Sequence, residues 1–179
     1  MCELLHPDTS SAGAAELVAL QRESYAVEAA LIGSDAIPPL HDTPATLVAA
    51  GLTWYGIRNG GDDGGGALLG AVAVAEEADA VDLDRLVVSP RAFRRGVGTA
   101  LVRHVLALAG DRRVDVSTGR DNAPARALYA RLGFVRTGEQ EVLPGLWVTR
   151  YARGAGAGPG AGPSAGGRAS GPRPPAGPG

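Results

Sequence analysis

The sequence predicts an α/β fold in which helices cross over between the strands of one sheet. Apolar residues recur at helical spacing in residues 14–31 and 98–109. Short apolar runs rich in valine, typical of strands, lie in residues 67–75 and 81–88. Turns rich in glycine and proline separate these segments. The predicted order is therefore two helices, three strands, a helix, a strand, a helix and two strands.

The N-terminal part supplies the first two helices. Residues 1–11 have no clear pattern, and we expect them to be irregular. The helix predicted over 14–31 ends near Gly33. The prolines within 37–40 require an extended chain there. A short second helix is predicted over 44–50, because a threonine N-cap precedes a proline at the first helical position.

The strands follow. The first is predicted over 52–58, and the glycine-rich turn over 59–66 leads to the second, 67–75. A turn at 76–79 precedes the third strand, 81–88. The remaining elements are a helix over 98–109 that Gly110 ends, a strand at 114–117, a helix over 124–132 that Gly133 ends, and strands at 134–142 and 146–151. The side chains expected to form the buried stripe of the 98–109 helix are Leu101, Val102, Val105, Leu106 and Leu108.

The composition changes at the C-terminal end. From Gly154 onward every residue is Gly, Ala, Pro, Ser or Arg. Ordering a residue costs roughly 1–2 kcal/mol, and side chains of these types bury too little apolar surface to offset that. We therefore expect one folded domain over residues 1–152 and a disordered tail over 153–179.

Charge and cysteine content restrict the class of protein. The net charge is −2, every basic residue is an arginine, and the tail carries arginines without an acid, so the expected domain is more acidic than the whole chain. This balance argues against a nucleic-acid partner. Cys2 is the single cysteine, which excludes an intrachain disulfide and fits a reducing cytoplasm.

Other features of the sequence bear on membrane spans, signal peptides, metal sites and the source of the protein. No apolar run reaches the roughly 18 residues that a membrane span requires, and there is no signal-peptide pattern. The histidines, His6, His41 and His104, lack metal-ligand spacing, so we expect no metal, and His104 is expected to be exposed. Abundant alanine, glycine and arginine without lysine suggest a GC-rich bacterial source.

The first motif is the segment Phe93-Arg94-Arg95-Gly96-Val97-Gly98-Thr99-Ala100, which follows a predicted strand and opens a predicted helix. A helix N-terminus presents unpaired N–H groups and the positive end of the helix dipole, and nearby glycines allow a phosphate to approach. A Walker loop is excluded because there is no lysine, and a dinucleotide fingerprint would need glycine where Leu101 stands. The segment therefore predicts an anion site, although a plain glycine-rich turn with solvated arginines remains open.

The second motif is Asn122-Ala123-Pro124-Ala125-Arg126-Ala127-Leu128-Tyr129-Ala130-Arg131-Leu132-Gly133-Phe134. Asn122 is a favourable N-cap, and the proline falls in the first turn of the helix. Ala125, Tyr129 and Leu132 share one face of that helix. A phenol with an ordinary pKa of about 10 can act as a general acid. A core tyrosine with a satisfied hydroxyl is the alternative.

Together the two segments resemble motifs A and B of the GNAT acyltransferase superfamily, with motif A over 86–101 and motif B over 122–134. The resemblance implies a mixed, mostly antiparallel sheet flanked by helices, and an N-acetyltransferase that carries acetyl groups from acetyl-CoA to an amine in a ternary complex. Phe93 departs from motif A, where the family has Gln or Arg. The residues that the resemblance implies for acetyl-CoA binding are Leu86, Val87, Val88, Arg94, Arg95, Gly96, Val97, Gly98, Thr99, Asn122, Ala125 and Tyr129.

The resemblance also implies chemical roles. Tyr129 would donate a proton as the thiolate leaves, and the strand-end N–H groups would polarise the thioester carbonyl. Asp84 and Glu28 are the leading candidates for the base that deprotonates the amine. The others are Asp82, Tyr25, His41 and Asp42. The acceptor is a small-molecule or peptide amine that the sequence does not identify, and the family often forms homodimers through its terminal strands. A non-catalytic acyl-CoA sensor is the alternative function.

Overall fold

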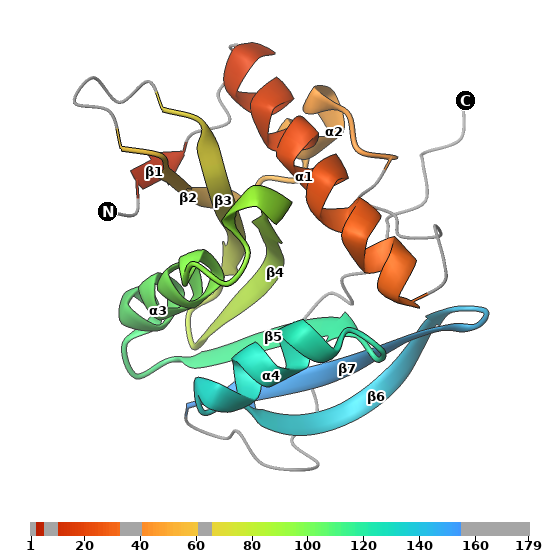
Figure 1. Ribbon diagram of the computed structural model, residues 1–179. Helices are drawn as coiled ribbons and strands as arrows, with labels where there is room; N and C mark the ends of the chain where they lie inside the picture. The colour runs from red at the N-terminus through yellow and green to blue at the C-terminus, as the bar shows by residue number, and fades with distance from the viewer. Residues whose placement is uncertain (1–2, 6–10, 33–40, 61–65, 155–179) are drawn as a thin grey trace, which may run out of the picture.

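The computed structural model describes residues 3–5, 11–32, 41–60 and 66–154. It confirms the α/β fold and the mostly antiparallel sheet that the sequence and its resemblance predict (Figure 1). The strands are β1 (Glu3–Leu5), β2 (Thr53–Arg58), β3 (Leu68–Glu76), β4 (Ala80–Val88), β5 (Arg113–Gly119), β6 (Val135–Leu143) and β7 (Leu146–Arg153). The helices are α1 (Ser11–Ile32), α2 (Pro44–Ala49), α3 (Val97–Ala109) and α4 (Ala123–Arg131), with a 3-10 turn, η2 (Pro90–Ala92).

The sheet has the strand order β1-β2-β3-β4-β5-β7-β6. Among the described strands, neighbours are antiparallel except β4 and β5, which run parallel. Helix α3 makes the connection that this parallel pair requires, and α4 connects β5 to the β6–β7 hairpin. Both motifs therefore lie on helices that follow a central strand.

Each face of the sheet has its own apolar core. The core beneath α3 and α4 contains Val72, Leu83, Leu101, Val116 and Tyr129. The core beneath α1 and α2 includes Leu17, Tyr25, Leu47, Trp54 and Val87. Successive residues of a strand point to opposite faces, so one strand contributes to both cores.

A β-bulge in β4 changes this alternation. Ala73 of β3 pairs with Arg85, whereas the next residue, Val74, pairs with Leu83, so Asp84 is the extra residue. Before the bulge, Leu83 faces the core under α3. After it, Arg85 reaches a side chain of α1, and the odd-numbered residues face α1 instead. A simple alternation through residues 81–88 predicts the wrong face for the second half of β4.

β4 and β5 separate beyond the bulge. Their parallel pairing covers Ala80–Leu83 and Arg113–Val116. From Asp84 onward no described strand pairs with the β5 side of β4, and Figure 1 shows the two strands diverging. Backbone groups along residues 84–88 therefore have no described strand partner on that edge.

Some predictions need correction. Residues 3–5 form β1 on the edge of the sheet instead of an irregular segment, because β1 depends on pairing with distant β2. In α3, Leu106 and Leu108 are only half-buried, whereas Ala109 is buried. His104 is not exposed: its ring packs 4.5 Å from the Tyr55 ring. Residues 37–40 and the tail beyond residue 154 lie outside the described residues.

Candidate active site

The N-terminus of α3 has the geometry expected of an anion site. Gly96 is the N-cap with φ +83°, and Arg94, with φ +61°, also lies in the left-handed region. A non-glycine residue held there stores strain, and such strain concentrates at functional sites. No side chain caps α3, so the N–H groups of Val97, Gly98 and Thr99 lack the partner that an N-cap side chain would supply. A Cβ on Gly96 would meet nothing within 4 Å, and both Arg94 and Arg95 are exposed.

A glycine that the motifs do not include holds α3 close to the sheet. A Cβ on Gly70 would lie 2.7 Å from Val97 Cγ1 and 3.1 Å from the Val87 carbonyl oxygen. The first turn of α3 therefore packs directly on the β3 backbone. Gly98 has more room, since its Cβ would lie 3.5 Å from Leu128 Cδ2, an ordinary contact. Gly70 is a glycine within an apolar strand, which is a known signal of close backbone approach.

The end of β4 lies between the two layers of helices. Val87 is buried against α1, whereas Leu86 and Val88 pack on the other face against the α3 core. The Val88 N–H donates to Ser24 Oγ of α1 across 3.3 Å. Sequence reasoning missed Ser24, whose hydroxyl satisfies a backbone donor on the edge where β4 leaves β5.

The second motif positions Tyr129 through α4. Asn122 is the N-cap, as predicted, and its Oδ1 accepts from the Ala125 N–H at 3.1 Å. Tyr129 is 3% exposed and lies against Phe134, with ring centroids 5.6 Å apart, and against Tyr151, at 5.9 Å. The aromatic contacts fix the ring and leave its hydroxyl as the one polar group.

The Tyr129 hydroxyl makes no hydrogen bond to any residue the structure describes. Burial raises its pKa above the ordinary value of 10, and the charges of Glu28 and Tyr151 add to the shift. Tyr129 therefore stays protonated throughout the neutral range and remains a hydrogen-bond donor. A hydroxyl that no described residue engages is free to donate to a bound ligand.

Tyr25 joins the helices to β4. It is 8% exposed, and burial raises its pKa, with Arg85 opposing the shift and Glu28, Asp84 and Tyr129 adding to it. These influences bring side chains of α1, β4 and α4 together around one phenol. Because its pKa is raised, Tyr25 is not a base at neutral pH, although the sequence leaves that role open.

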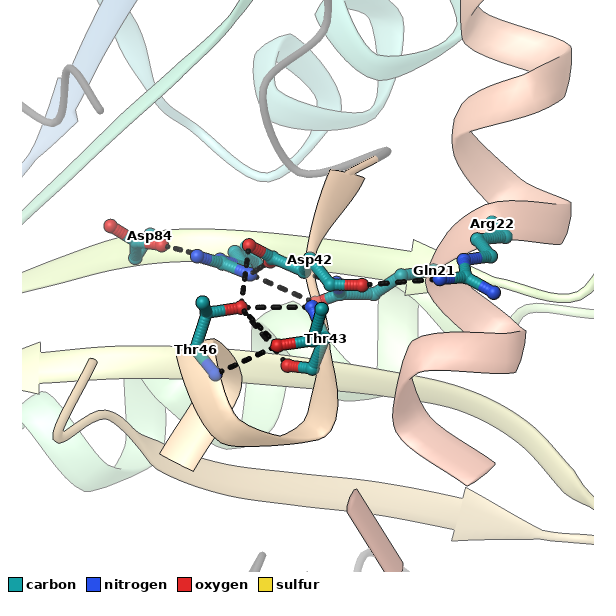
Figure 2. Close-up of polar contacts among 7 residues, drawn as sticks. Gln21, Arg22, Asp42, Thr43, Thr46 and Asp84 are labelled. Carbon is teal, nitrogen blue, oxygen red and sulfur yellow. Dashed lines mark hydrogen bonds and ion pairs between the residues drawn. The ribbon is translucent and has the colours of Figure 1, made fainter. Parts of the chain in front are cut away.

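Arg85 belongs to a polar network on the α1 side of β4 that includes Gln21, Asp42 and Asp84, which are labelled in Figure 2. Its Nε donates to Asp84 Oδ1 at 3.0 Å, and its NH1 donates to Gln21 Oε1 at 3.1 Å and to Asp42 Oδ2. Gln21, which is fully buried, also donates to Asp42 Oδ2 at 3.1 Å. Sequence reasoning missed Arg85 and Gln21; the available signal was one polar residue within the apolar face of α1.

The contacts in the structure distinguish the residues that are candidates for the base. Asp84 is engaged by Arg85, and Asp42 is held within the same network. His41 is exposed, and Asp82 lies in the part of β4 that still pairs with β5. Glu28 makes no hydrogen bond or ion pair to a described residue, yet its charge reaches both Tyr25 and Tyr129.

The arrangement combines an anion site, an open strand edge, a protonated phenol and an unengaged carboxylate. Such a set can hold a phosphate-bearing chain along β4 and carry out acid–base chemistry at its end. The class of protein follows from the sequence comparison, which indicates an acyltransferase of this α/β fold. The sequence model described as acetyltransferase (GNAT) family matches residues 18–134, and this chain belongs to that family. The family uses acetyl-CoA as donor.

Individual proteins are similar to this chain in sequence or in fold. UPF0157 protein YqkA of Bacillus subtilis (strain 168) is 31% identical over 134 residues, which cover 74% of this chain. The match spans 38% of that relative, well under two thirds of its length. The Escherichia coli ribosomal-protein-S18-alanine N-acetyltransferase is 16% identical, with a TM-score of 0.64 over 85% of this chain and 91% of its own. The Thermoplasma acidophilum PaiA N-acetyltransferase in complex with coenzyme A is 16% identical, with a TM-score of 0.59 over 84% and 98%.

At these sequence identities, the similarity of this chain to the solved structures shows a common fold alone. Two further observations concern the described residues. No helix among them is long and apolar enough to cross a membrane, and no three of their His, Cys, Asp or Glu side chains gather as metal ligands would. The expectations of no metal, no nucleic acid, a cytoplasmic location and a homodimer remain predictions.

Proposed function

We propose that this protein transfers an acetyl group from acetyl-CoA to an amine, which attacks the thioester directly while both substrates are bound. The observation that carries the proposal is the Tyr129 hydroxyl, which belongs to a side chain that is 3% exposed, stays protonated and makes no hydrogen bond to a described residue. It lies on the helix of the second motif, close enough for the Glu28 charge to shift its pKa.

The donor would bind along the β4 edge. Its pyrophosphate is the ligand that the N-terminus of α3 suits, with Arg94 and Arg95 nearby to contact phosphate oxygens. The pantetheine arm would follow Leu86–Val88, where β4 has no strand partner on the β5 side in the described chain. Asn122 and Ala125, at the start of α4, would border the arm from the opposite side.

Tyr129 would serve the leaving group. As the C–S bond breaks, negative charge develops on sulfur, and the phenol donates a hydrogen bond and then its proton to the thiolate. Its raised pKa makes it a weaker acid than an exposed tyrosine, so the hydrogen bond in the transition state is the larger part of its contribution. Backbone N–H groups on the β4 edge would stabilise the developing oxyanion.

Glu28 would accept a proton from the incoming ammonium, directly or through a water molecule. Two properties favour it over Asp84. It has no competing ion pair among the described residues, and it influences both buried phenols. Asp84 is already engaged in an ion pair with the Arg85 guanidinium.

The acceptor class is a small-molecule or peptide amine. The neighbours support that breadth without choosing within it: one acts on an alanine of ribosomal protein S18 and another is a nourseothricin acetyltransferase. The latter is 25% identical over 56% of this chain and 64% of its own, with a TM-score of 0.50. Residues of α1 and α2 would form part of the acceptor site, and they would determine which amine this chain accepts.

Two measurements test the proposal. Calorimetric titration with acetyl-CoA should give saturable binding, and a panel of amines and N-terminal peptides should identify acceptors that provoke release of free thiol. Mass spectrometry should find the acetyl group on the amine. Tight binding without release by any amine would favour the acyl-CoA sensor, and absence of acetyl-CoA binding would refute both functions.

A further inference from the structure

We propose that Arg85 is the positioning residue of the acceptor side, holding the chain at the start of α2 and the bulge of β4 in one arrangement. The inference rests on the proposed acetyl transfer and adds a residue that neither motif contains. Arg85 lies on β4, the strand proposed to hold the pantetheine arm, but its side chain contacts α1 and the residue before α2, whereas Leu86 and Val88 pack against the opposite core.

The first argument is the number of segments that meet at one guanidinium. Arg85 donates to Gln21 on α1, to Asp42 just before α2, and to Asp84 in the bulge. Figure 2 shows these side chains converging from three separate elements. The planar guanidinium suits this task, since it presents several N–H donors in fixed directions.

The second argument is the position of Asp42, which lies directly before α2 and is contacted from both α1 and α2. Thr46 Oγ1 donates to Asp42 Oδ1 at 3.5 Å, and Arg22 NH2 donates to the Asp42 carbonyl oxygen at 3.4 Å. Thr43 and Thr46 form a reciprocal capping box at the start of α2. A displacement of Asp42 would therefore move the whole N-terminus of α2.

The third argument is charge. The side chains of Arg85, Asp42 and Asp84 are 14%, 16% and 21% exposed, so all three are largely removed from water. Burial acts to lower the pKa of Arg85, but Tyr25, Asp42 and Asp84 outweigh it and hold the pKa above its usual value. Without the guanidinium, two carboxylates would face each other with no cation between them, and such pairs separate.

Arg85 is also joined to the reaction centre. Its charge acts on Tyr25, whose phenol is surrounded by Asp84, Glu28 and Tyr129. Loss of Arg85 should therefore displace the acceptor-side groups relative to Tyr129 while leaving the α3 anion site intact. A displacement of about 1 Å at a reaction centre reduces rates by roughly 10²-fold.

The test compares Arg85→Met and Arg85→Lys with Arg58→Met. Arg58 is a matched control: its side chain is 23% exposed, it forms a two-point ion pair with Glu16 of α1, and it has no assigned part in the reaction. Steady-state kinetics use acetyl-CoA and the amine with the highest turnover in the panel. We expect both Arg85 variants to raise the KM for the amine about 10- to 100-fold, with the KM for acetyl-CoA unchanged. Arg85→Lys should not restore the KM for the amine, because one ammonium group cannot reproduce the several N–H donors that a guanidinium holds in fixed directions.

Hydrogen exchange gives a second measurement that needs no turnover. Amides of α2, Pro44–Ala49, should exchange faster in Arg85→Met than in Arg58→Met, while those of α3 should not change. Asp42→Asn, a milder change at the same contact, should reproduce the α2 effect. Equal shifts in both KM values, or α2 exchange that matches the Arg58 control, would overturn the inference. Acetyl-CoA binding by the wild-type protein is measured separately, so failure of the proposed function is recognised independently.

Discussion

Asp84 and Arg85 are adjacent in β4, and the bulge between them brings the Arg85 guanidinium back onto the Asp84 carboxylate, with Nε 3.0 Å from Oδ1. In a regular strand these side chains would point to opposite faces. The bulge thus creates an ion pair beside Tyr25 and occupies a carboxylate that the sequence marks as a candidate base. Glu28, which has no such partner among the described residues, is the stronger candidate.

This relationship predicts unequal effects of two conservative substitutions. Glu28→Gln removes the proposed proton acceptor, and we expect kcat to fall on the order of 10²-fold or more with the KM for acetyl-CoA unchanged. Asp84→Asn keeps an acceptor for Arg85 Nε and should lower kcat less than about tenfold. Thiol release measured at saturating acetyl-CoA and amine gives kcat for each variant and separates the two. A larger loss in Asp84→Asn would reverse the assignment.

Tyr129→Phe should abolish most of the activity and leave the fold unchanged. The hydroxyl makes no hydrogen bond within the described chain, and the ring contacts with Phe134 and Tyr151 are retained. We expect kcat to fall about 10²- to 10⁴-fold and the free energy of unfolding to change by less than about 0.5 kcal/mol. Tyr151→Phe is the control, since it removes a neighbouring hydroxyl that accepts from Arg126. Similar losses of kcat in both variants would contradict a specific catalytic role for Tyr129.

The raised pKa of Tyr129 gives a further expectation. Because burial and Glu28 hold the phenol protonated, its ionisation should not limit kcat anywhere in the ordinary tyrosine range near pH 10. A loss of activity there that disappears in Tyr129→Phe would show instead that the phenol ionises normally. The measurement is kcat at saturating acetyl-CoA from neutral to alkaline pH, compared between the two proteins.

The sequence predicts the helices, most strands and both motifs because these depend on neighbouring residues. Asn122 as N-cap and Gly96 at the start of α3 follow from local backbone chemistry, and both are confirmed. β1 was missed because it depends on pairing with β2, some fifty residues away. The Arg85 network joins residues as far apart as Gln21 and Arg85, and no local pattern contains such a contact.

The bulge explains why the site is harder to predict than the fold. One extra residue at Asp84 reverses the faces of all later residues in β4, so Arg85 reaches α1 and Leu86 reaches the α3 core. The sequence names Asp84 and Glu28 with equal weight. Only the contacts made after folding distinguish a carboxylate held by a guanidinium from one without a partner.

Gly70 and Gly98 should respond differently to the same added methyl group. In Gly70→Ala the Cβ would lie 2.7 Å from Val97 Cγ1, so the first turn of α3 must move away from the sheet. We expect a loss of about 1–3 kcal/mol in the free energy of unfolding, with weaker acetyl-CoA binding. In Gly98→Ala the nearest atoms are at 3.5 and 3.6 Å, so stability should hold while the methyl group hinders the pyrophosphate.

Chemical denaturation and calorimetric titration of both variants check this pair. If Gly98→Ala binds acetyl-CoA as tightly as the wild-type protein, the α3 N-terminus is not the pyrophosphate site. If Gly70→Ala is as stable as the wild-type protein, α3 can move away from β3 without the loss of stability that their close contact predicts.

The ion pair between Glu16 and Arg58 should contribute to stability only above acidic pH. Hydrogen bonding from Arg58 lowers the pKa of Glu16; burial opposes the shift, while the Arg58 charge and the Leu68 N–H support it. A carboxyl whose pKa is lower in the folded state binds fewer protons there than in the unfolded chain. Its contribution is therefore complete above the unfolded pKa and disappears as the pH falls through the folded pKa.

Glu16→Gln should accordingly be less stable than the wild-type protein near pH 7 and equally stable near a pH of about 3. The difference at neutral pH should be modest, about 1 kcal/mol or less, because the Glu16 side chain is 37% exposed and solvent screens the pair. Thermal unfolding of both proteins over this pH range measures the effect, and Arg58→Met should give the same pH dependence because it removes the same pair. A difference that grows toward low pH would mean that Glu16 stabilises the fold in its protonated form.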